Sequence, residues 1–388
     1  MGASLQLPFT YQANSAYLAV AHVTTPFISV YPWSSSGFGT KFGNPAALPG
    51  GNGFGASFTN SNDAIAVGSA TTPFIQAYPW SATGFGTKFA NPTLPTGRGR
   101  QTAFTTAGDA VAVGSDATPF ILAYSWTDSG FGTIFSNPAT LPTGLGLGVA
   151  FTTTDDAIVV GHATSPYVSA YPWSTSGFGT KFTDPVSYLG TQTSGVAFTT
   201  AGNALALAHS STPFVTVYPW STSGFGTKFA DPGTPPTGVG RDAVFTTTDN
   251  AIAVAHDNTP FVSVYAWSGS GFGTRFTDPG TLPTGDGRGS AFTSFDDALA
   301  IAHDIAPFVS VYPWSGSGFG TKFTNPATLP AAQGLGAAFA KFDDALAIAH
   351  DTTPFVTAYP WSTSGFGTKF TNPATLPTGQ GRQPIFSH

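Results

Sequence analysis

The chain of 388 residues contains no cysteine and no glutamate, and only 8% of its residues are charged. Without cysteine there can be no disulfide, no thiolate nucleophile and no zinc–cysteine site. A typical globular protein has about 25% charged residues, so Ser, Thr, Asn, Gly and Pro must cover much of this surface. The 13 bases and 19 acids give a net charge of −6, which argues against a nucleic-acid partner.

Long apolar runs are also missing. The first residues, MGASLQLPFTYQ, lack a basic stretch followed by an apolar run, so we expect no Sec signal peptide. The stretch AYLAVAH is far shorter than the roughly 20 residues that cross a bilayer. We therefore expect no membrane insertion. The compartment stays unassigned, and delivery by virion assembly or by lysis stays open.

What the sequence does contain is one unit repeated eight times. The stretch YPWSTSGFGTKF occurs three times letter for letter, and five near-copies accompany it. Successive tryptophans are 47 residues apart, except for one step of 46. They are Trp33, Trp80, Trp126, Trp173, Trp220, Trp267, Trp314 and Trp361. Such self-similarity at a fixed period indicates a repeat architecture.

Each unit reads as four short strands. In the sixth copy the runs DAVFTTT, AIAVAH, FVSVYAW and FGTRF are separated by turns rich in Asp, Asn, Gly, Ser and Pro. Four strands every 47 residues predict an all-β fold, an eight-bladed β-propeller of four-stranded antiparallel blades. Residues 1–388 then form a single domain, because each blade needs its neighbours to bury its faces.

The second strand suggests how the blades touch. In AIAVAH, Ile252 and Val254 point to one face and the alanines to the other. Neighbouring blades can then interlock, with large side chains packed over alanine. On this interpretation the repeated aromatic motif is mainly a packing joint.

Ring closure involves both ends of the chain. Candidate first strands occur nine times, because residues 5–11 (LQLPFTY) and 382–388 (RQPIFSH) both resemble one. We expect the N- and C-terminal strands to meet in one blade. One end supplies the inner strand there, and the other lies alongside or exchanges with a neighbouring molecule. Closure removes the exposed edges of a linear array, which favours a monomeric ring.

The order of the parts resembles WD40-like propeller repeats, on the stretch AVFTTTDNAIAVAHDNTPFVSVYAW and its equivalents. The resemblance covers almost the whole chain and implies that the first strand lines the channel and the fourth is outermost. It departs from that family in two ways: Trp is followed by Ser or Thr rather than Asp, and the usual Gly-His is absent. The YPWS…GFGTKF repeat also resembles uncharacterised proteins of bacteriophage genomes.

Six histidines end the second strand of their copies: His22, His162, His209, His256, His303 and His350. One interpretation is a ring of imidazoles that contacts a ligand on one rim. The other is a polar strand end that bonds to the following turn. Shared zinc binding is disfavoured, since ligands must lie about 2 Å from the metal and equivalent positions in separate blades lie too far apart.

Departures from the repeat are further candidates for ligand contact. Loop arginines occur irregularly, at Arg98, Arg100, Arg241 and Arg288, and the fourth copy carries Tyr188 and Gln192 in place of the usual loop. The paired acids, such as Asp155–Asp156, are expected to form turns. The GFG stretches are expected to pack between blades, because no helix follows to make a phosphate loop.

No unique nucleophile–base set converges in this sequence, so we expect no enzyme and no cofactor. The expected function is a non-enzymatic binding or scaffold propeller for a protein partner, virion-associated or surface-exposed. The alternative is a multivalent lectin with one weak glycan site per blade, acting through avidity. Exposed repeated aromatics would favour the lectin, whereas buried aromatics and one asymmetric patch would favour the scaffold.

Overall fold

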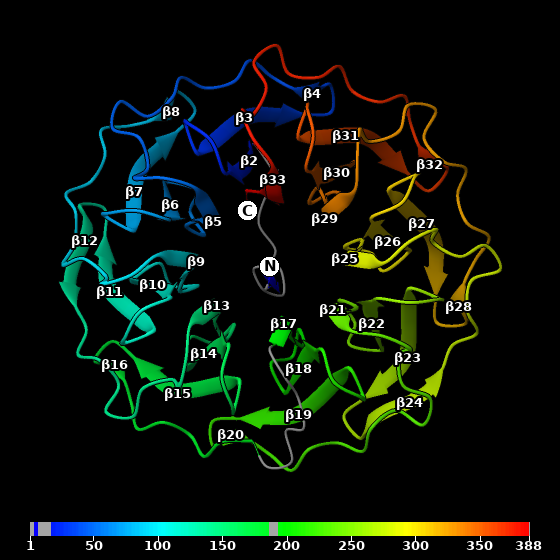
Figure 1. The fold of residues 1–388 in the computed structure, drawn as a ribbon, viewed down its shortest axis with the longest axis horizontal. Helices are drawn as coiled ribbons and strands as arrows, with labels where there is room; N and C mark the ends of the chain where they lie inside the picture. The colour runs from blue at the N-terminus through cyan, green and yellow to red at the C-terminus, as the bar shows by residue number, and fades with distance from the viewer. Residues whose placement is uncertain (1–3, 7–16, 186–192, 388) are drawn as a thin grey trace.

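The computed structural model describes residues 4–6, 17–185 and 193–387. Eight antiparallel sheets stand around a central channel as the blades of a propeller (Figure 1). Seven blades have four strands in sequence order, the remaining blade pairs the last strand of the chain with three strands near its start, and one of the sheets gains a fifth strand. The prediction of an all-β, eight-bladed propeller is confirmed.

Two strands of each blade lie toward the channel (Figure 1). The inner strands are β33 (Gly381–Phe386), β5 (Gly53–Phe58), β9 (Gly99–Phe104), β13 (Gly146–Phe151), β17 (Thr193–Phe198), β21 (Gly240–Phe245), β25 (Gly287–Phe292) and β29 (Gly334–Phe339). The second strands are β2 (Tyr17–His22), β6 (Ala64–Ser69), β10 (Ala110–Ser115), β14 (Ala157–His162), β18 (Ala204–His209), β22 (Ala251–His256), β26 (Ala298–His303) and β30 (Ala345–His350). Blades 1 to 8 are numbered in this order.

The other two strands complete each blade toward the outside. The third strands are β3 (Ile28–Ser34), β7 (Ile75–Ser81), β11 (Ile121–Thr127), β15 (Val168–Ser174), β19 (Val215–Ser221), β23 (Val262–Ser268), β27 (Val309–Ser315) and β31 (Val356–Ser362). The outer strands are β4 (Gly37–Phe38), β8 (Gly84–Phe85), β12 (Gly130–Ile134), β16 (Gly177–Phe178), β20 (Gly224–Phe225), β24 (Gly271–Arg275), β28 (Gly318–Phe319) and β32 (Gly365–Phe366). The first strand therefore lines the channel and the fourth is outermost, as expected.

The length of the outer strand depends on one residue of the third strand. Six blades have proline before the tryptophan and an outer strand of two residues. Blades 3 and 6 have Ser125 and Ala266 there, and their outer strands β12 and β24 are five residues long. Proline has no backbone N–H to donate to the ladder, so its replacement restores a donor and the pairing extends.

The hydrophobic core consists of the packed interfaces between neighbouring blades, which we call joints. At the joint of blades 3 and 4, the alanine face of β10 (Ala110 and Ala112) packs against Ile158 and Val160 of β14. All four side chains are buried. The predicted interlocking of large residues over alanine is therefore confirmed, and each buried large side chain contributes roughly 1.5–3 kcal/mol.

Aromatic rings close the same joint farther out. Trp173 of blade 4 meets Phe178 of its own blade, with ring centroids 5.1 Å apart, and Phe135 of blade 3, at 5.0 Å. Both pairs are edge-to-face, the arrangement that aromatic quadrupoles favour. Gly177 is required beneath Phe135, because its φ is +93° and an added Cβ would lie 2.8 Å from that ring. The repeated GFG and final Phe are thus structural parts of the joint.

The two paired aspartates of the first turn bond to different blades, one to its own and one to the neighbouring blade. Asp156 accepts a hydrogen bond from Thr152 Oγ1 (2.6 Å) and so fixes the turn of its own blade. Asp155, at a φ of 54°, accepts two 2.8 Å bonds from the backbone N–H groups of Thr106 and Ala107 in blade 3. The expected turn is present, and in addition it joins two blades. Equivalent bonds across joints come from Asp249, Asp296 and Asp343.

Ring closure joins the two ends of the chain in blade 1. The C-terminal strand β33 supplies the inner strand and pairs antiparallel with β2, from Leu18↔Phe386 to His22↔Gly381. Tyr31 also donates a hydrogen bond to the carbonyl of Thr375 (3.0 Å). The expectation that the ring closes within one blade, between the C-terminal strand and the first part of the chain, is confirmed.

The strand that precedes β2 does not pair where we expected. Its described strand, β1 (Ser4–Gln6), pairs in parallel with β17 of blade 5, beginning with Ser4↔Gly195. It therefore does not lie alongside the closing blade. In the closing blade β33 already occupies the inner edge of β2, so that edge is not available to β1. Residues 7–16 lie outside the described part of the chain.

Candidate binding site at the channel mouth

The six histidines are buried inside their blades. Each is fully buried, and its Nε2 lies 2.9–3.0 Å from a hydroxyl of the third strand seven residues later. In blade 1, for example, His22 Nε2 meets Ser29 Oγ, while the His22 backbone N–H donates to the carbonyl of Phe27. The histidine thus links the strand to the turn that follows it.

Burial also sets the charge state of these imidazoles. Loss of solvent lowers the pKa of His22, His162, His209, His303 and His350 to about 4, and it lowers the pKa of His256 as well. Nearby backbone carbonyls raise these pKa values, but by less than burial lowers them. The hypothesis of a ligand-contacting ring of imidazoles is wrong for this structure, because no histidine edge among the six reaches solvent. The alternative, in which the polar strand end bonds to the turn that follows it, agrees with the hydrogen bonds of these histidines.

Copies without histidine change both members of the pair. Ser69 of blade 2 donates to Gln76 Oε1 (3.2 Å), and Gln76 stands where the six blades with histidine have Ser or Thr. In blade 3, Ser115 is matched by Leu122. A small residue on the second strand is therefore accompanied by a larger one on the third, which keeps the joint filled.

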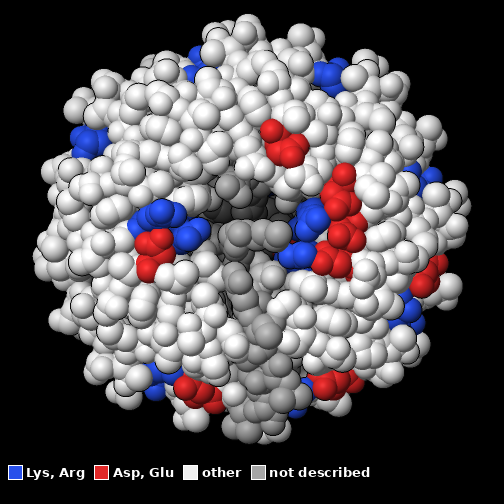
Figure 2. All heavy atoms as spheres, viewed as in Figure 1, with Lys and Arg blue, Asp and Glu red and all other residues white. Residues whose placement is uncertain are grey.

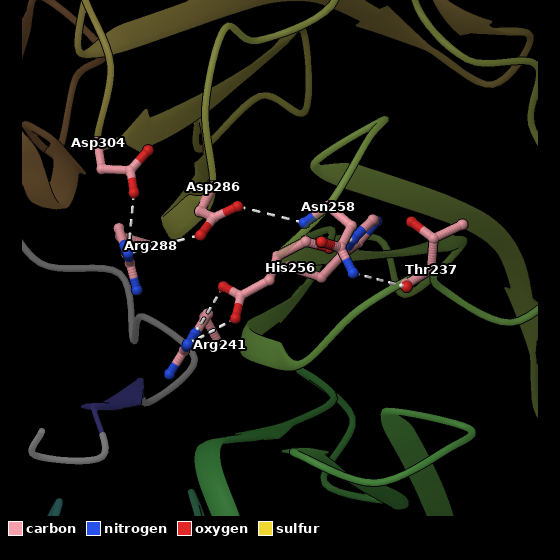
Figure 3. Close-up of polar contacts among 8 residues, drawn as sticks. Thr237, Arg241, His256, Asn258, Asp286, Arg288 and Asp304 are labelled. Carbon is pink, nitrogen blue, oxygen red and sulfur yellow. Dashed lines mark hydrogen bonds and ion pairs between the residues drawn. The ribbon is translucent and has the colours of Figure 1, made fainter.

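Two of the predicted arginines lie together on blades 6 and 7 (Figure 3). Arg241 makes a two-point ion pair with Asp257, with Nε–Oδ1 at 2.8 Å and Nη2–Oδ2 at 2.6 Å. This pairing raises the pKa of Arg241 further. Arg288 bonds to Asp304 at 2.9 Å and lies 3.6 Å from Asp286. Arg–carboxylate pairs of this geometry hold both side chains in fixed positions.

Asp286 connects the two blades. Its Oδ1 accepts a 3.2 Å bond from the backbone N–H of Asn258, in the second turn of blade 6, and the Asn258 amide reaches the carbonyl of Thr237 (3.1 Å). Two arginines and three aspartates therefore form one network at the inner end of blades 6 and 7 (Figure 3).

The other two predicted arginines lie on blade 3. The Arg98 backbone N–H donates to Asp116 Oδ1 (2.7 Å), and its side-chain Nε lies 3.6 Å from the same carboxylate. Arg100 lies 3.7 Å from Asp116 and stands over the ring of Phe54 in blade 2, 4.9 Å from the centroid. This geometry is a cation–π contact.

Figure 2 shows these charges in two groups on opposite sides of the central opening, over β9 on one side and over β21 and β25 on the other. The blade 3 group has two arginines and one aspartate. The blade 6–7 group has two arginines and three aspartates. The two groups thus carry opposite net charges in a chain that has few charges at all. We call the two groups together the charged channel mouth. Its members are Arg98, Arg100, Asp116, Arg241, Asp257, Asp286, Arg288 and Asp304.

The remaining candidates of the fourth copy, Tyr188 and Gln192, lie outside the described residues. The irregular residues of the third copy have structural partners. Ser125 Oγ donates to the carbonyl of Thr133 (3.3 Å), and Ile134 packs against the core of that joint.

The aspartate partners of the arginines were missed by reasoning from the sequence. Each lies 16 residues after its arginine, just past the second strand of the same copy: Arg100–Asp116, Arg241–Asp257 and Arg288–Asp304. Blade 4 has Leu147 and Ala163 at these two positions. Comparison of the copies gives only a partial signal, because blade 1 has Arg382 with Val23 and blade 8 has Leu335 with Asp351 at these positions.

Within the described residues, no group of three or more His, Cys, Asp or Glu side chains could hold a metal ion. The same part of the chain has no helix that is long and apolar enough to cross a membrane.

No protein-family model matches this chain, and no curated protein does either. Solved structures do match. They include a protein of unknown function from Desulfotomaculum acetoxidans (14% identity, TM-score 0.57, 82% of this chain and 97% of the other). A protein from Lactobacillus plantarum gives 13% identity and a TM-score of 0.59 over 82% and 98%. Hydrazine synthase of Kuenenia stuttgartiensis gives 11% and 0.57 over 82% and 97%. At these identities the similarity shows the fold alone.

Proposed function

We propose that this chain is a non-enzymatic, WD40-like propeller scaffold that binds one protein partner at its charged channel mouth. The observation that carries the proposal is the concentration of scarce charges there: Arg–Asp pairs on blades 3, 6 and 7 break the eightfold repeat. A partner with complementary charges would be oriented by groups of opposite sign on the two sides of the opening. Closure within one chain supports a monomeric ring.

The same surface gives little support to an enzyme or a nucleic-acid binder. Each arginine of the charged channel mouth already contacts a carboxylate, so no unpaired positive patch faces a phosphate. Charged pairs of this kind favour specificity and orientation in protein association more than raw affinity. An exposed role, on a virion or a cell surface, agrees with the coverage by Ser, Thr, Asn and Gly.

The lectin alternative loses its main support. It requires the repeated aromatics to be exposed, but the eight tryptophans are only 4–7% exposed and pack edge-to-face with phenylalanines. A glycan array with the purified chain tests it directly. A hit with several equivalent sites per chain by calorimetry would restore the lectin and exclude the scaffold.

Site-specific crosslinking tests the scaffold. A photoreactive residue is placed at Asp286 of blade 7 or, as a matched control, at the equivalent Leu145 of blade 4, and the chain is expressed in its native source. We expect a defined protein adduct from position 286 and none from 145. Adducts of equal yield from both positions, or from neither, would contradict the proposal.

A matched double variant checks that the adduct depends on the ion pair. Arg241→Leu with Asp257→Ala gives blade 6 the residues of blade 4, Leu147 and Ala163, so it should fold. We expect the adduct at 286 to fall with unchanged thermal unfolding.

A further inference from the structure

A second surface stands out at the opposite end of the blades. The first and second turns lie at opposite ends of each second strand, so the first turns face away from the charged channel mouth. In blades 7 and 8 these turns carry Phe295 and Phe342, which are 74% and 47% exposed. The equivalent residues of blades 2 to 6 are small: Ser61, Ala107, Thr154, Ala201 and Thr248. A single exposed ring is ordinary, but two on adjacent turns suggest an interaction site.

The two turns are held side by side by hydrogen bonds across the joint. Asp343, the residue after Phe342, accepts bonds from Ser294 Oγ (2.7 Å) and from the backbone N–H groups of Ser294 (3.0 Å) and Phe295 (3.2 Å). Both phenylalanines thus extend from a rigid frame. A rigid aromatic anchor costs little conformational entropy on binding.

Aspartates follow both rings directly in the sequence of their turns. The turns contain Asp296, Asp297, Asp343 and Asp344 against the single base Lys341. In blade 7, Thr293 Oγ1 donates to Asp297 (2.7 Å). Blade 8 has Ala340 at the threonine position, so Asp344 has no such hydroxyl and is exposed. The surface therefore combines two exposed aromatic rings with acidic side chains from the same turns.

We propose that this blade 7–8 turn surface, formed by Phe295, Phe342, Asp297 and Asp344, docks an extended protein segment with a large apolar side chain flanked by lysine or arginine. The apolar side chain would cover the two rings, and the cations would face the aspartates and the ring faces. The excess of aspartates in these turns disfavours acidic or phosphorylated segments. The inference rests on the proposed scaffold function and adds a second, chemically different docking surface to it.

Selection from a random peptide display library on the immobilised full chain tests this surface. Enriched peptides are then measured against the variant Phe295→Thr with Phe342→Thr, which carries the residue that blades 4 and 6 have naturally. We expect enriched peptides with a positive charge and a large apolar residue, and at least about a tenfold loss of affinity in the double variant. Asp344→Asn should weaken binding and flatten its dependence on salt.

The matched control is Ser61→Ala with Thr154→Ala, at the same turn position in blades 2 and 4, which should bind as the parent chain does. Neutral or acidic peptides, failure to enrich any peptide, or equal binding to the double variant would overturn the inference. So would self-association that disappears in the double variant, since it would assign the surface to a second copy. If position 286 still crosslinks a protein while the selection fails, only this inference falls.

Discussion

The buried histidines of six blades link the stability of the ring to pH. The folded pKa of His350 is about 4, against an ordinary value of 6.5, so the unfolded chain binds the proton more readily between these values. Stability is therefore fully present above about pH 6.5 and decreases as pH falls toward 4. Five of the six buried histidines share this value and act in the same direction.

The Ser69–Gln76 pair of blade 2 provides a test that uses residues the ring already tolerates. His350→Ser with Thr357→Gln should fold and should lose less unfolding free energy between pH 7 and pH 5 than the parent chain. Urea unfolding at several pH values measures this. Identical pH profiles for the two proteins would show that His350 does not titrate as described.

Asp242 should respond to pH in the opposite direction. It is 2% exposed on the inner strand of blade 6, and burial raises its pKa to about 6 although Ser290 donates two hydrogen bonds to it. The folded state then holds the proton more tightly, so this group costs stability as pH rises through 6. We expect Asp242→Asn to gain stability relative to the parent chain between pH 5 and pH 8. A constant difference across that range would contradict this assignment.

The hydrogen bonds that first-turn aspartates accept from the neighbouring blade can be removed or added by substitution. Asp296 accepts bonds from the backbone and hydroxyl groups of Thr247 and Thr248, at a φ of 55°. Asp296→Gly keeps this backbone conformation accessible and should cost about 1–3 kcal/mol of unfolding free energy. The reciprocal Gly202→Asp, at a φ of 66°, should stabilise the joint of blades 4 and 5. Urea unfolding of both variants measures these free energies. An unchanged unfolding free energy in Asp296→Gly would show that the bonds of Asp296 do not stabilise the contact between the blades.

At the scale of strands, one proline decides how far the outer edge of a blade is paired. Ala266→Pro should shorten β24 to the length seen in six other blades, because the ladder loses a donor. Hydrogen exchange at Thr274 and Arg275 should then become as fast as at Thr321 and Lys322 of blade 7. Unchanged protection in the variant would show that another interaction holds the strand.

The sequence predicted the strands and their order well because the signal is repeated eight times. Alternation in β22 gave the packing of the joints correctly. The position of the histidines was ambiguous, since a strand end can face solvent or a neighbouring turn. The hydroxyl seven residues after each histidine was the available signal, and the Ser69–Gln76 exchange supports it. The Arg–Asp pairs were missed because the partners are distant in sequence and meet only when the blade folds.

At the scale of the whole molecule, the ring combines a symmetric frame with asymmetric surfaces. The frame is built from similar contacts between neighbouring blades and is closed by β33, which pairs the C-terminal end of the chain with β2. The surfaces differ from blade to blade: charge gathers at the mouth of the channel on blades 3, 6 and 7, and exposed rings occur on blades 7 and 8. The repeated residues thus provide the packing, and we assign binding to the residues that are not repeated.

The stoichiometry of the complex tests this separation most directly. Native mass spectrometry of the full chain, mixed with the protein crosslinked at position 286 or with any glycan found on the array, counts bound copies per ring. We predict one copy of a protein partner per chain and no series of glycan adducts. A ladder of adducts rising toward the number of blades would mean that the repeated motif is itself the binding site, and would contradict the account.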